Sequence, residues 1–293
     1  MSEISLAGKV AIITGGAGAI GSAIAGGLMK AGASVAAVDV SAKGLQRLAD
    51  DLNANAKRFM PVEVDVGSWS AAEAAVRRVT EHFGSVDIVV NNAAMFREST
   101  MPPGYAEKGV PLWDIVPEAY GRMLTVNAIA QFYFARAAIK QMMARKWGRI
   151  INVSTSFDSM FAPRTSAYGA AKAAIEVNAV VWAKELAGSG VTVNVLIPGG
   201  PVDRTVPIPA APPVGEMAPD VMVPPLVWLA SDYAKDVTGS RIIADEWNTN
   251  TPASQIQTQA IAPAAWPGLA KESATRRAAR IKERGRAPWP GHS

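Results

Sequence analysis

The sequence predicts an α/β fold, a single doubly wound domain in which helices cover both faces of a seven-stranded, mostly parallel sheet. Two observations carry this prediction. Short β-branched runs alternate along the chain with longer alanine-rich segments of helical period, which is the pattern of βαβ units. The 293 residues are 49% apolar and 18% charged, a composition that suits one large domain with a well-filled core.

The predicted strands are continuous apolar runs, which indicates a sheet buried on both faces. We expect strands at 9–14, 34–38, 58–64, 86–90, 148–154, 191–197 and 240–244. We expect helices at 19–31, 42–54, 69–83, 117–146, 166–188 and 219–231. These helices then form the right-handed crossovers between parallel strands.

Two connections break this rhythm. Residues 95–117 carry four prolines and two glycines, and residues 198–225 carry nine prolines. Because each proline removes a backbone donor and fixes φ, neither stretch is helical throughout. Both follow strands that end at the ligand crevice, so we expect a wall and a lid over a substrate. The alternative is two irregular surface connections.

The βα pattern is lost beyond Asn248, and we divide the chain into one domain at 1–250 and a terminal extension at 251–293. The extension carries seven basic residues and two acidic ones, a net charge of +5, whereas the whole chain has +4. The basicity therefore belongs to the tail, which is either a solvated or disordered end or an anion-binding patch. We expect no nucleic-acid partner.

Residue usage excludes several kinds of chemistry. The chain has no cysteine, and its only histidines are His82 and His292, so we expect no disulfide, no thiolate nucleophile and no Cys or His metal site. Redox chemistry must then come from an organic cofactor. The N-terminus begins Met-Ser-Glu without a basic region before its first apolar run, so we expect a cytoplasmic protein with no membrane partner.

A glycine cluster lies between the first strand and the first helix. Residues 14–21 read Thr-Gly-Gly-Ala-Gly-Ala-Ile-Gly. Glycine lets the backbone turn sharply and approach a pyrophosphate, whose charge is favoured by the unpaired N–H groups of the helix N-terminus. In this strand-to-helix context the cluster predicts dinucleotide binding, with a tight structural turn as the alternative.

Polar residues follow the next three strands. Asp39 ends the second strand, where its carboxylate can accept hydrogen bonds from both ribose hydroxyls and repel a 2′-phosphate, so we expect NAD as the cofactor. No lysine or arginine is beside it in sequence or in the glycine cluster. The alternative is an exposed acid that closes a strand. Asp65 with Val66 and residues 91–94, Asn-Asn-Ala-Ala, follow the third and fourth strands.

The chemical core is Tyr168-Gly169-Ala170-Ala171-Lys172. Spacing of four residues on a helix places the phenol and the ammonium on one face. A free tyrosine has a pKa of about 10 and is a poor base at neutral pH. A nearby ammonium favours the phenolate, which makes the side chain usable for general acid and base catalysis.

The glycine cluster, Asn-Asn-Ala-Ala, Tyr-x-x-x-Lys and Ile197-Pro198-Gly199 occur in an order and spacing that resemble the short-chain dehydrogenase/reductase family, a Rossmann-like family. The resemblance covers about residues 6–248. It implies an NAD-dependent oxidoreductase that acts on a CH-OH group and assembles as a homo-oligomer, a tetramer or a dimer.

The resemblance also implies roles for individual residues. The expected cofactor contacts are Gly15, Ala19, Ile20 and Gly21 at the pyrophosphate, Asp39 at the adenosine ribose, Asp65 and Val66 at the adenine, Asn92, Ala93 and Lys172 at the inner ribose, and Pro198 and Gly199 beside the nicotinamide. Tyr168 is implied as the acid or base, with Lys172 lowering its pKa. Asn127, on the long fourth helix, is implied to hold a water that links Lys172 to solvent.

Three positions depart from the family pattern. The substrate-orienting serine, thirteen residues before the tyrosine, is Thr155 here, with Ser154 and Ser156 beside it as alternatives. Ala94 replaces the usual glycine of Asn-Asn-Ala-Gly. Residues 242–247, Ile-Ile-Ala-Asp-Glu-Trp, replace the usual Asp-Gly-Gly ending, which puts the family's subunit contact in doubt.

The sequence leaves two functions open. The first is hydride transfer between NAD(H) and a secondary alcohol or ketone, and the second is a catalytically silent NAD-binding sensor or scaffold. Apolar residues in the two loops favour a largely apolar substrate: Met95, Trp113, Ile208, Met217 and Met222. The alternative is a substrate with a carboxylate, which three arginines could bind: Arg97, Arg164 and Arg204.

Overall fold

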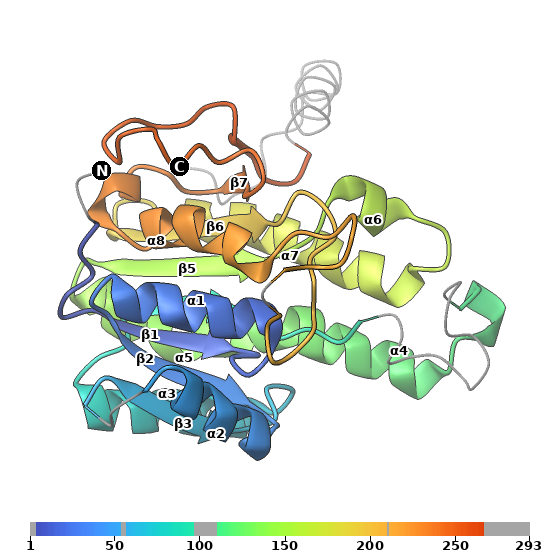
Figure 1. The fold of residues 1–293 in the computed structure, drawn as a ribbon, viewed down its shortest axis with the longest axis horizontal. Coiled ribbons are helices and arrows are strands. Elements are labelled where there is room, and N and C mark those ends of the chain that lie inside the picture. Colours follow the sequence, from blue (N-terminus) through green and yellow to red (C-terminus); the bar gives the residue numbers. More distant parts are fainter. Residues whose placement is uncertain (1–3, 54–56, 97–109, 210, 267–293) are drawn as a thin grey trace, which may run out of the picture.

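The structure is a computed structural model that describes residues 4–53, 57–96, 110–209 and 211–266. Its centre is an eight-stranded sheet in the order β3-β2-β1-β4-β5-β6-β7-β8 (Figure 1). The strands are β1 Val10–Thr14, β2 Ser34–Asp39, β3 Phe59–Glu63, β4 Ile88–Asn91, β5 Gly148–Val153, β6 Val191–Ile197, β7 Ser240–Ile243 and β8 Ile261–Pro263. The first seven are parallel to one another and correspond to the seven predicted strands, so the predicted fold class is confirmed.

Helices cover both faces of the sheet because the strands carry apolar side chains on both. The main helices are α1 Ala19–Lys30, α2 Ala42–Asp51, α3 Trp69–Phe83, α4 Pro117–Leu124, α5 Ala130–Ala144, α6 Phe157–Phe161, α7 Ser166–Glu185 and α8 Val223–Leu229. Alternate residues of β1 enter opposite cores: Ile12 packs in the core that α3, α5 and α7 share, and Ile13 packs in the core of α1, α2 and α8. Among the described helices, none has the length and apolar character needed to cross a membrane.

The sheet order places the ligand crevice. The chain adds strands outward from β1 to β3 and then returns to the other side of β1 to form β4. At such a switch point the loops after the two central strands diverge, which opens a crevice at their carboxyl ends. The residues that follow β1, β4, β5 and β6 therefore meet at one edge of the sheet.

The predicted helix at 117–146 is interrupted. A π-helical turn, Thr125–Ile129, separates α4 from α5. Within this turn Asn127 accepts a hydrogen bond from the Met95 N–H at 2.6 Å and donates one to the Met95 carbonyl oxygen at 2.8 Å. The turn thus fixes the backbone that leaves β4. Helical periodicity in the sequence does not predict this contact, because Met95 is far from Asn127 in the chain.

The eighth strand is one more than the sequence predicted. β8 lies in the segment assigned to the terminal extension and pairs antiparallel with β7, Arg241 opposite Ala262. Figure 1 shows this C-terminal segment folded back along the β7 edge of the sheet. The three-residue strand gives no periodic signal, and it forms because it satisfies the open edge of β7. The described part of the extension also accepts a hydrogen bond from Trp228 Nε1 at the Ala253 carbonyl, 2.8 Å away.

Candidate active site

A cavity of about 760 Å³ opens at the carboxyl ends of the strands. Twelve of the fifteen predicted cofactor and catalytic residues line it: Gly15, Ala19, Ile20, Gly21, Asp39, Asn92, Ala93, Thr155, Tyr168, Lys172, Pro198 and Gly199. They come from segments up to 184 residues apart in the chain, so only the fold brings them together. Three others, Asp65, Val66 and Asn127, lie outside the wall.

The glycine cluster forms one end of the cavity, and its geometry requires glycine at two positions. Gly15 has φ of +65°, and a Cβ atom there would lie 2.8 Å from the Ala93 Cα. At Gly21 a Cβ would lie 2.1 Å from the Gly15 carbonyl oxygen. The backbone can therefore turn tightly at this point only without side chains.

The N-terminus of α1 fits a pyrophosphate. No side chain caps the helix at Gly18. The first-turn N–H groups of Ala19, Ile20 and Gly21 have no carbonyl partner within the helix, and these residues line the cavity. Unpaired donors at the positive end of a helix bind anions, so the residues present suit the phosphates of a dinucleotide.

Thr14 joins the glycine cluster to the end of β4, a role that was not predicted from the sequence. Its hydroxyl accepts hydrogen bonds from the N–H groups of Asn92 and Ala93 at 3.0 and 3.1 Å. Asn92 Nδ2 donates in return to the carbonyl oxygens of Thr14 and Gly15 at 3.1 and 3.0 Å. A hydroxyl that ends an otherwise apolar strand was the available signal.

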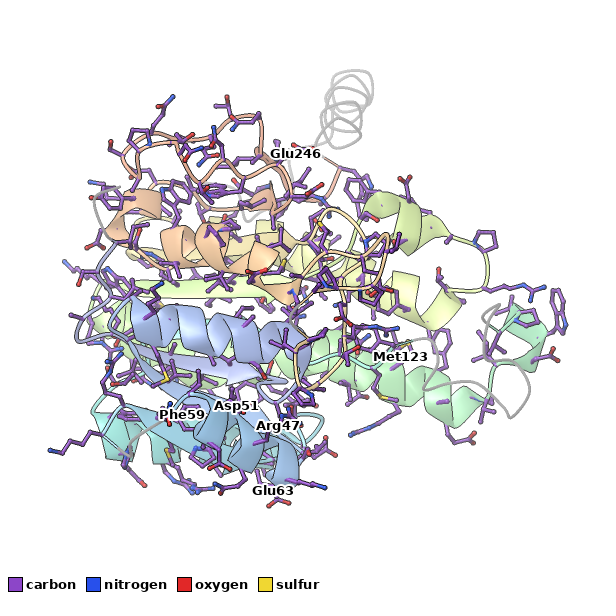
Figure 2. All side chains as sticks on the ribbon, viewed as in Figure 1. Arg47, Asp51, Phe59, Glu63, Met123 and Glu246 are labelled. Carbon is purple, nitrogen blue, oxygen red and sulfur yellow. The ribbon has the colours of Figure 1, made fainter. Side chains whose placement is uncertain are left out.

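Asp39 lies at the end of β2 and holds two backbone segments. Its Oδ2 accepts from the Ala17 N–H at 3.1 Å, and its Oδ1 accepts from the Ser41 N–H at 3.0 Å. A basic residue does approach this region: Arg47, on α2, donates to the Ala17 carbonyl oxygen at 2.7 Å. Figure 2 labels Arg47 beside Asp51, with which it forms an ion pair at 3.9 Å. Arg47 does not line the cavity, so Asp39 is the charged group of the wall at this end.

Tyr168 and Lys172 lie one turn apart on α7 and both line the cavity. The Lys172 Nζ lies 5.6 Å from the centre of the Tyr168 ring and donates to the Val153 carbonyl oxygen at 2.9 Å. Lys172 is only 2% exposed. Burial lowers the pKa of Lys172 to about 8, because removing the ammonium from water penalises its charged form. The site therefore holds an amine that titrates near physiological pH beside a phenol.

The segment after β5 supplies three hydroxyl residues to the cavity wall: Ser154, Thr155 and Ser156. Ser156 caps α6, where its Oγ accepts from the Ser159 N–H at 3.3 Å and contacts the Ser159 hydroxyl at 3.0 Å. The Ser154 Oγ is buried and has no hydrogen-bond partner among the described residues. Of the two serines considered as alternatives to Thr155, Ser156 is thus engaged in a cap, and Ser154 offers an unpaired hydroxyl.

The three residues outside the wall each have another partner. Asp65 Oδ1 accepts from Arg122 Nη2 at 2.7 Å, and this hydrogen bond lowers the pKa of Asp65 from its usual value. Val66 packs in the core that includes α3. The Asn127 amide is bonded to the backbone of Met95. Their expected contacts at the adenine and at a water stay predictions, and the structure places the three residues outside the cavity wall.

The segment 198–225 contributes to the substrate end of the cavity. Val202 forms a bridge with Met217 at the base of the segment, and Arg204 and Glu216 line the cavity beside it. The Arg204 guanidinium lies 4.2 Å from the centre of the Phe96 ring, which also lines the cavity. Most of the other predicted loop, residues 97–109 with Arg97, lies outside the described residues.

The side chains that favoured an apolar substrate lie elsewhere. Trp113 is 83% exposed, and Met222 is buried in the core beneath α1 and α8. None of the five apolar loop residues named from the sequence lines the cavity. The wall instead includes further hydroxyls at Ser159 and Thr165, which were not predicted because they lie on segments with no motif.

Comparisons with known proteins agree with this arrangement. The family model for short chain dehydrogenase matches residues 9–205. A 3-oxoacyl-(acyl-carrier-protein) reductase of Pseudomonas aeruginosa is 31% identical over 249 residues, 82% of this chain and 96% of that protein. A 2-dehydro-3-deoxy-D-gluconate 5-dehydrogenase of Pseudoalteromonas atlantica is 31% identical over 258 residues, 84% of this chain and 97% of that protein.

Two further relatives extend the comparison. A D-threitol dehydrogenase of Mycolicibacterium smegmatis is 31% identical over 256 residues, 83% of this chain and 94% of that protein. The crystal structure of a short-chain type dehydrogenase/reductase from Mycobacterium marinum superposes with a TM-score of 0.70 at 26% identity, covering 82% of this chain and 95% of that one. The chain belongs to the short-chain dehydrogenase/reductase family.

Proposed function

We propose that this protein is an NAD-dependent dehydrogenase that interconverts a secondary alcohol and a ketone. Members of its family are oxidoreductases that use nicotinamide cofactors. The observation that carries the proposal is the shared cavity wall of the glycine cluster, Thr155, Tyr168 and Lys172. A silent sensor would need the glycine cluster but not the phenol and ammonium beside it.

In the proposed mechanism Tyr168 exchanges a proton with the substrate oxygen. Lys172 favours the phenolate form of Tyr168, because its ammonium lies 5.6 Å from the centre of the ring. The Thr155 hydroxyl donates a hydrogen bond to the same substrate oxygen and orients it. When bound, the nicotinamide cofactor supplies or accepts the hydride.

The remaining wall residues are proposed to hold the cofactor. Backbone N–H groups at Ala19, Ile20 and Gly21 would donate to its phosphates, with Gly15 allowing the close approach. Asn92, Ala93, Pro198 and Gly199 line the cavity and would flank the inner ribose and nicotinamide. We propose that Asn127 acts as a positioning residue, because it holds Met95 just after β4.

We propose NAD over NADP because of Asp39. Its carboxylate lines the cavity at the end of β2, and the nearby Arg47 is bonded to a backbone carbonyl rather than facing the cavity. A carboxylate accepts hydrogen bonds from a ribose and repels a 2′-phosphate.

We propose a substrate that carries polar groups besides the reacting one, in place of the largely apolar substrate favoured by the loop composition. The substrate end of the cavity presents hydroxyls at Ser154, Ser159 and Thr165 and charges at Arg204 and Glu216. The buried Ser154 hydroxyl has no hydrogen-bond partner among the described residues, so a ligand or water has to match it, because an unpaired polar group is costly to bury. Two relatives are named for a polyol and a sugar acid, which agrees with this choice.

The family resemblance also leads us to propose a homo-oligomer. Apolar side chains are exposed on the outer faces of α5 and α7, at Phe132, Val177 and Val181, each 43% exposed. Exposed apolar patches on helix faces are typical of interfaces. Light scattering measures the mass, and a monomer at micromolar concentration would contradict the proposal.

The experiment is a panel of polyols, sugar acids and apolar secondary alcohols assayed by NADH absorbance, first with the wild type and then with Tyr168→Phe. We expect the variant to lose at least about 100-fold in kcat, the scale of general acid and base catalysis. Tyr233→Phe is the matched control, because Tyr233 is exposed and lies outside the cavity wall. Unchanged kcat in Tyr168→Phe would overturn the mechanism, and NADH binding without turnover of any compound would favour the silent sensor.

A further inference from the structure

A buried ion pair lies directly behind the catalytic segment. Glu176 is on α7, one turn beyond Lys172, and is fully buried. It pairs with Arg241 on β7, which is 4% exposed. A buried carboxylate and guanidinium are costly to desolvate unless every polar atom finds a partner, so the further contacts of this pair indicate what it holds in place.

Arg241 connects the pair to Thr155. Its Nη2 donates to the Thr155 carbonyl oxygen at 2.7 Å, while its Nη1 is the atom that pairs with Glu176. Its guanidinium also lies 4.2 Å from the centre of the Phe157 ring. A planar guanidinium that donates in two directions and stacks on a ring has one orientation, so it fixes the backbone of Thr155 relative to α7.

The second Glu176 oxygen connects the pair to the C-terminal extension. Oε2 accepts a hydrogen bond from the Ala265 N–H at 3.1 Å. The Ala265 backbone adopts φ of +57°, a left-handed conformation that an alanine keeps only where its surroundings hold it. The extension thus reaches the back of the active site at a specific hydrogen bond.

The next residue of the extension packs against α6. The Trp266 ring lies 6.0 Å from the Phe157 ring and 6.3 Å from the Phe161 ring, and these two phenylalanines stack on each other at 6.0 Å. Residues from this segment, Ser156 and Ser159, line the cavity. The extension and Arg241 therefore clamp the same stretch, residues 155–161, from behind.

We propose that Arg241 and Glu176 are positioning residues for Thr155, and that residues 264–266 of the extension complete the support of this cavity wall. The inference rests on the proposed function, since it gives Thr155 the task of orienting the substrate oxygen. Arg241 does not line the cavity, and it acts through its hydrogen bond to the Thr155 backbone. Displacement by about 1 Å is enough to reduce turnover by up to about 100-fold in an oriented site.

The test uses the full chain and the variants Arg241→Lys and Thr155→Ala, alone and together. A lysine keeps the charge but cannot donate to Glu176 and Thr155 with one rigid fork. We expect Arg241→Lys to lower kcat about tenfold with the NADH dissociation constant within about twofold, because the lost contact orients the reaction rather than the cofactor. In the Thr155→Ala background the same change should cost less than about twofold, since both act through one residue.

Arg149→Lys is the matched control. Arg149, at the start of β5, is equally buried and pairs with Asp232. Its hydrogen bonds, however, go to backbone carbonyls at the amino ends of the strands, away from the cavity. We expect it to lower the melting temperature without changing kcat. Equal kcat losses in Arg149→Lys and Arg241→Lys, or a full Arg241→Lys loss in the Thr155→Ala background, would overturn the proposal.

Hydrogen exchange supplies a readout that does not need turnover. Arg241→Lys and Trp266→Ala should each speed amide exchange in residues 155–161, whereas Arg149→Lys should not. Unchanged exchange in the first two variants would overturn the proposed support. If Thr155→Ala alone leaves kcat unchanged, the role of Thr155 in the proposed function fails, and that failure is visible separately from the exchange result.

Discussion

The Lys172 ammonium donates to the Val153 carbonyl oxygen at 2.9 Å and, among the described residues, forms no ion pair with a carboxylate. Its burial is therefore uncompensated by an opposite charge, and the pKa of Lys172 falls from 10.5 to about 8. The Lys172 Nζ lies 5.6 Å from the centre of the Tyr168 ring. The site thus gives up stability to keep a cation beside the phenol.

The first prediction concerns stability and pH. Below pH 8 the folded and unfolded states both protonate Lys172, and the buried charge costs about 3 kcal/mol at 1.36 kcal/mol per pKa unit. Between pH 8 and 10.5 the folded state loses this proton while the unfolded state keeps it, so wild-type stability rises with pH relative to Lys172→Met. Urea unfolding of both proteins from pH 7 to 10.5 measures the difference. The exposed Lys184→Met on the same helix should show no such dependence, and a flat difference for Lys172→Met would contradict the prediction.

The second prediction concerns cofactor choice. Asp39→Asn keeps an acceptor for the backbone but removes the charge that would face a 2′-phosphate. We expect the NADP to NAD preference to rise at least about tenfold, because like charges brought together cost several kcal/mol and each 1.4 kcal/mol is tenfold. Dissociation constants from NADH and NADPH fluorescence check this. Asp50→Asn on the outer face of α2 is the control. An unchanged ratio of NADPH to NADH dissociation constants in Asp39→Asn would contradict the role of Asp39 in selecting NAD.

The third prediction concerns the glycine cluster. Gly21→Ala would place a methyl 2.1 Å from the Gly15 carbonyl oxygen. We therefore expect the free energy of unfolding to fall by about 1–3 kcal/mol, the usual cost of overpacking, and NADH to bind more weakly. Gly26→Ala on the same helix meets its nearest neighbour, the Leu52 Cδ2, at 3.4 Å. That change should stabilise by about 0.5–1 kcal/mol, since alanine is the better helix former. Thermal unfolding measures both stability changes. Equal changes for Gly21→Ala and Gly26→Ala would contradict the close approach of Gly21 to the Gly15 carbonyl.

The fourth prediction contrasts two serines. Ser154→Ala removes a buried hydroxyl that has no partner, so the free protein should keep or gain stability while the substrate KM rises. Ser156→Ala removes the α6 cap and should cost about 1 kcal/mol, the typical value of an N-cap. Unfolding free energies and KM values measure both. An unchanged KM in Ser154→Ala would show that its hydroxyl does not meet the substrate.

Much of the fold was readable from the sequence because local patterns and global fold agree. The apolar runs that became β1, β5 and β6 are long enough to indicate buried strands, and the glycine cluster between a strand and a helix indicates a tight turn. Spacing of four residues on a helix was likewise enough to place Tyr168 and Lys172 on one face. These features depend on neighbours in sequence.

Tertiary structure alone decided the rest. Arg47 reaches the glycine cluster from α2, thirty residues after Ala17, and Asp65 turns to Arg122 fifty-seven residues away. β8 exists because β7 would otherwise keep an open edge, and the Glu176–Arg241 pair meets Thr155 only where α7, β7 and the extension converge. Periodicity reports which side of an element is buried, but the partner of a polar side chain is chosen by elements that the chain brings together from far apart.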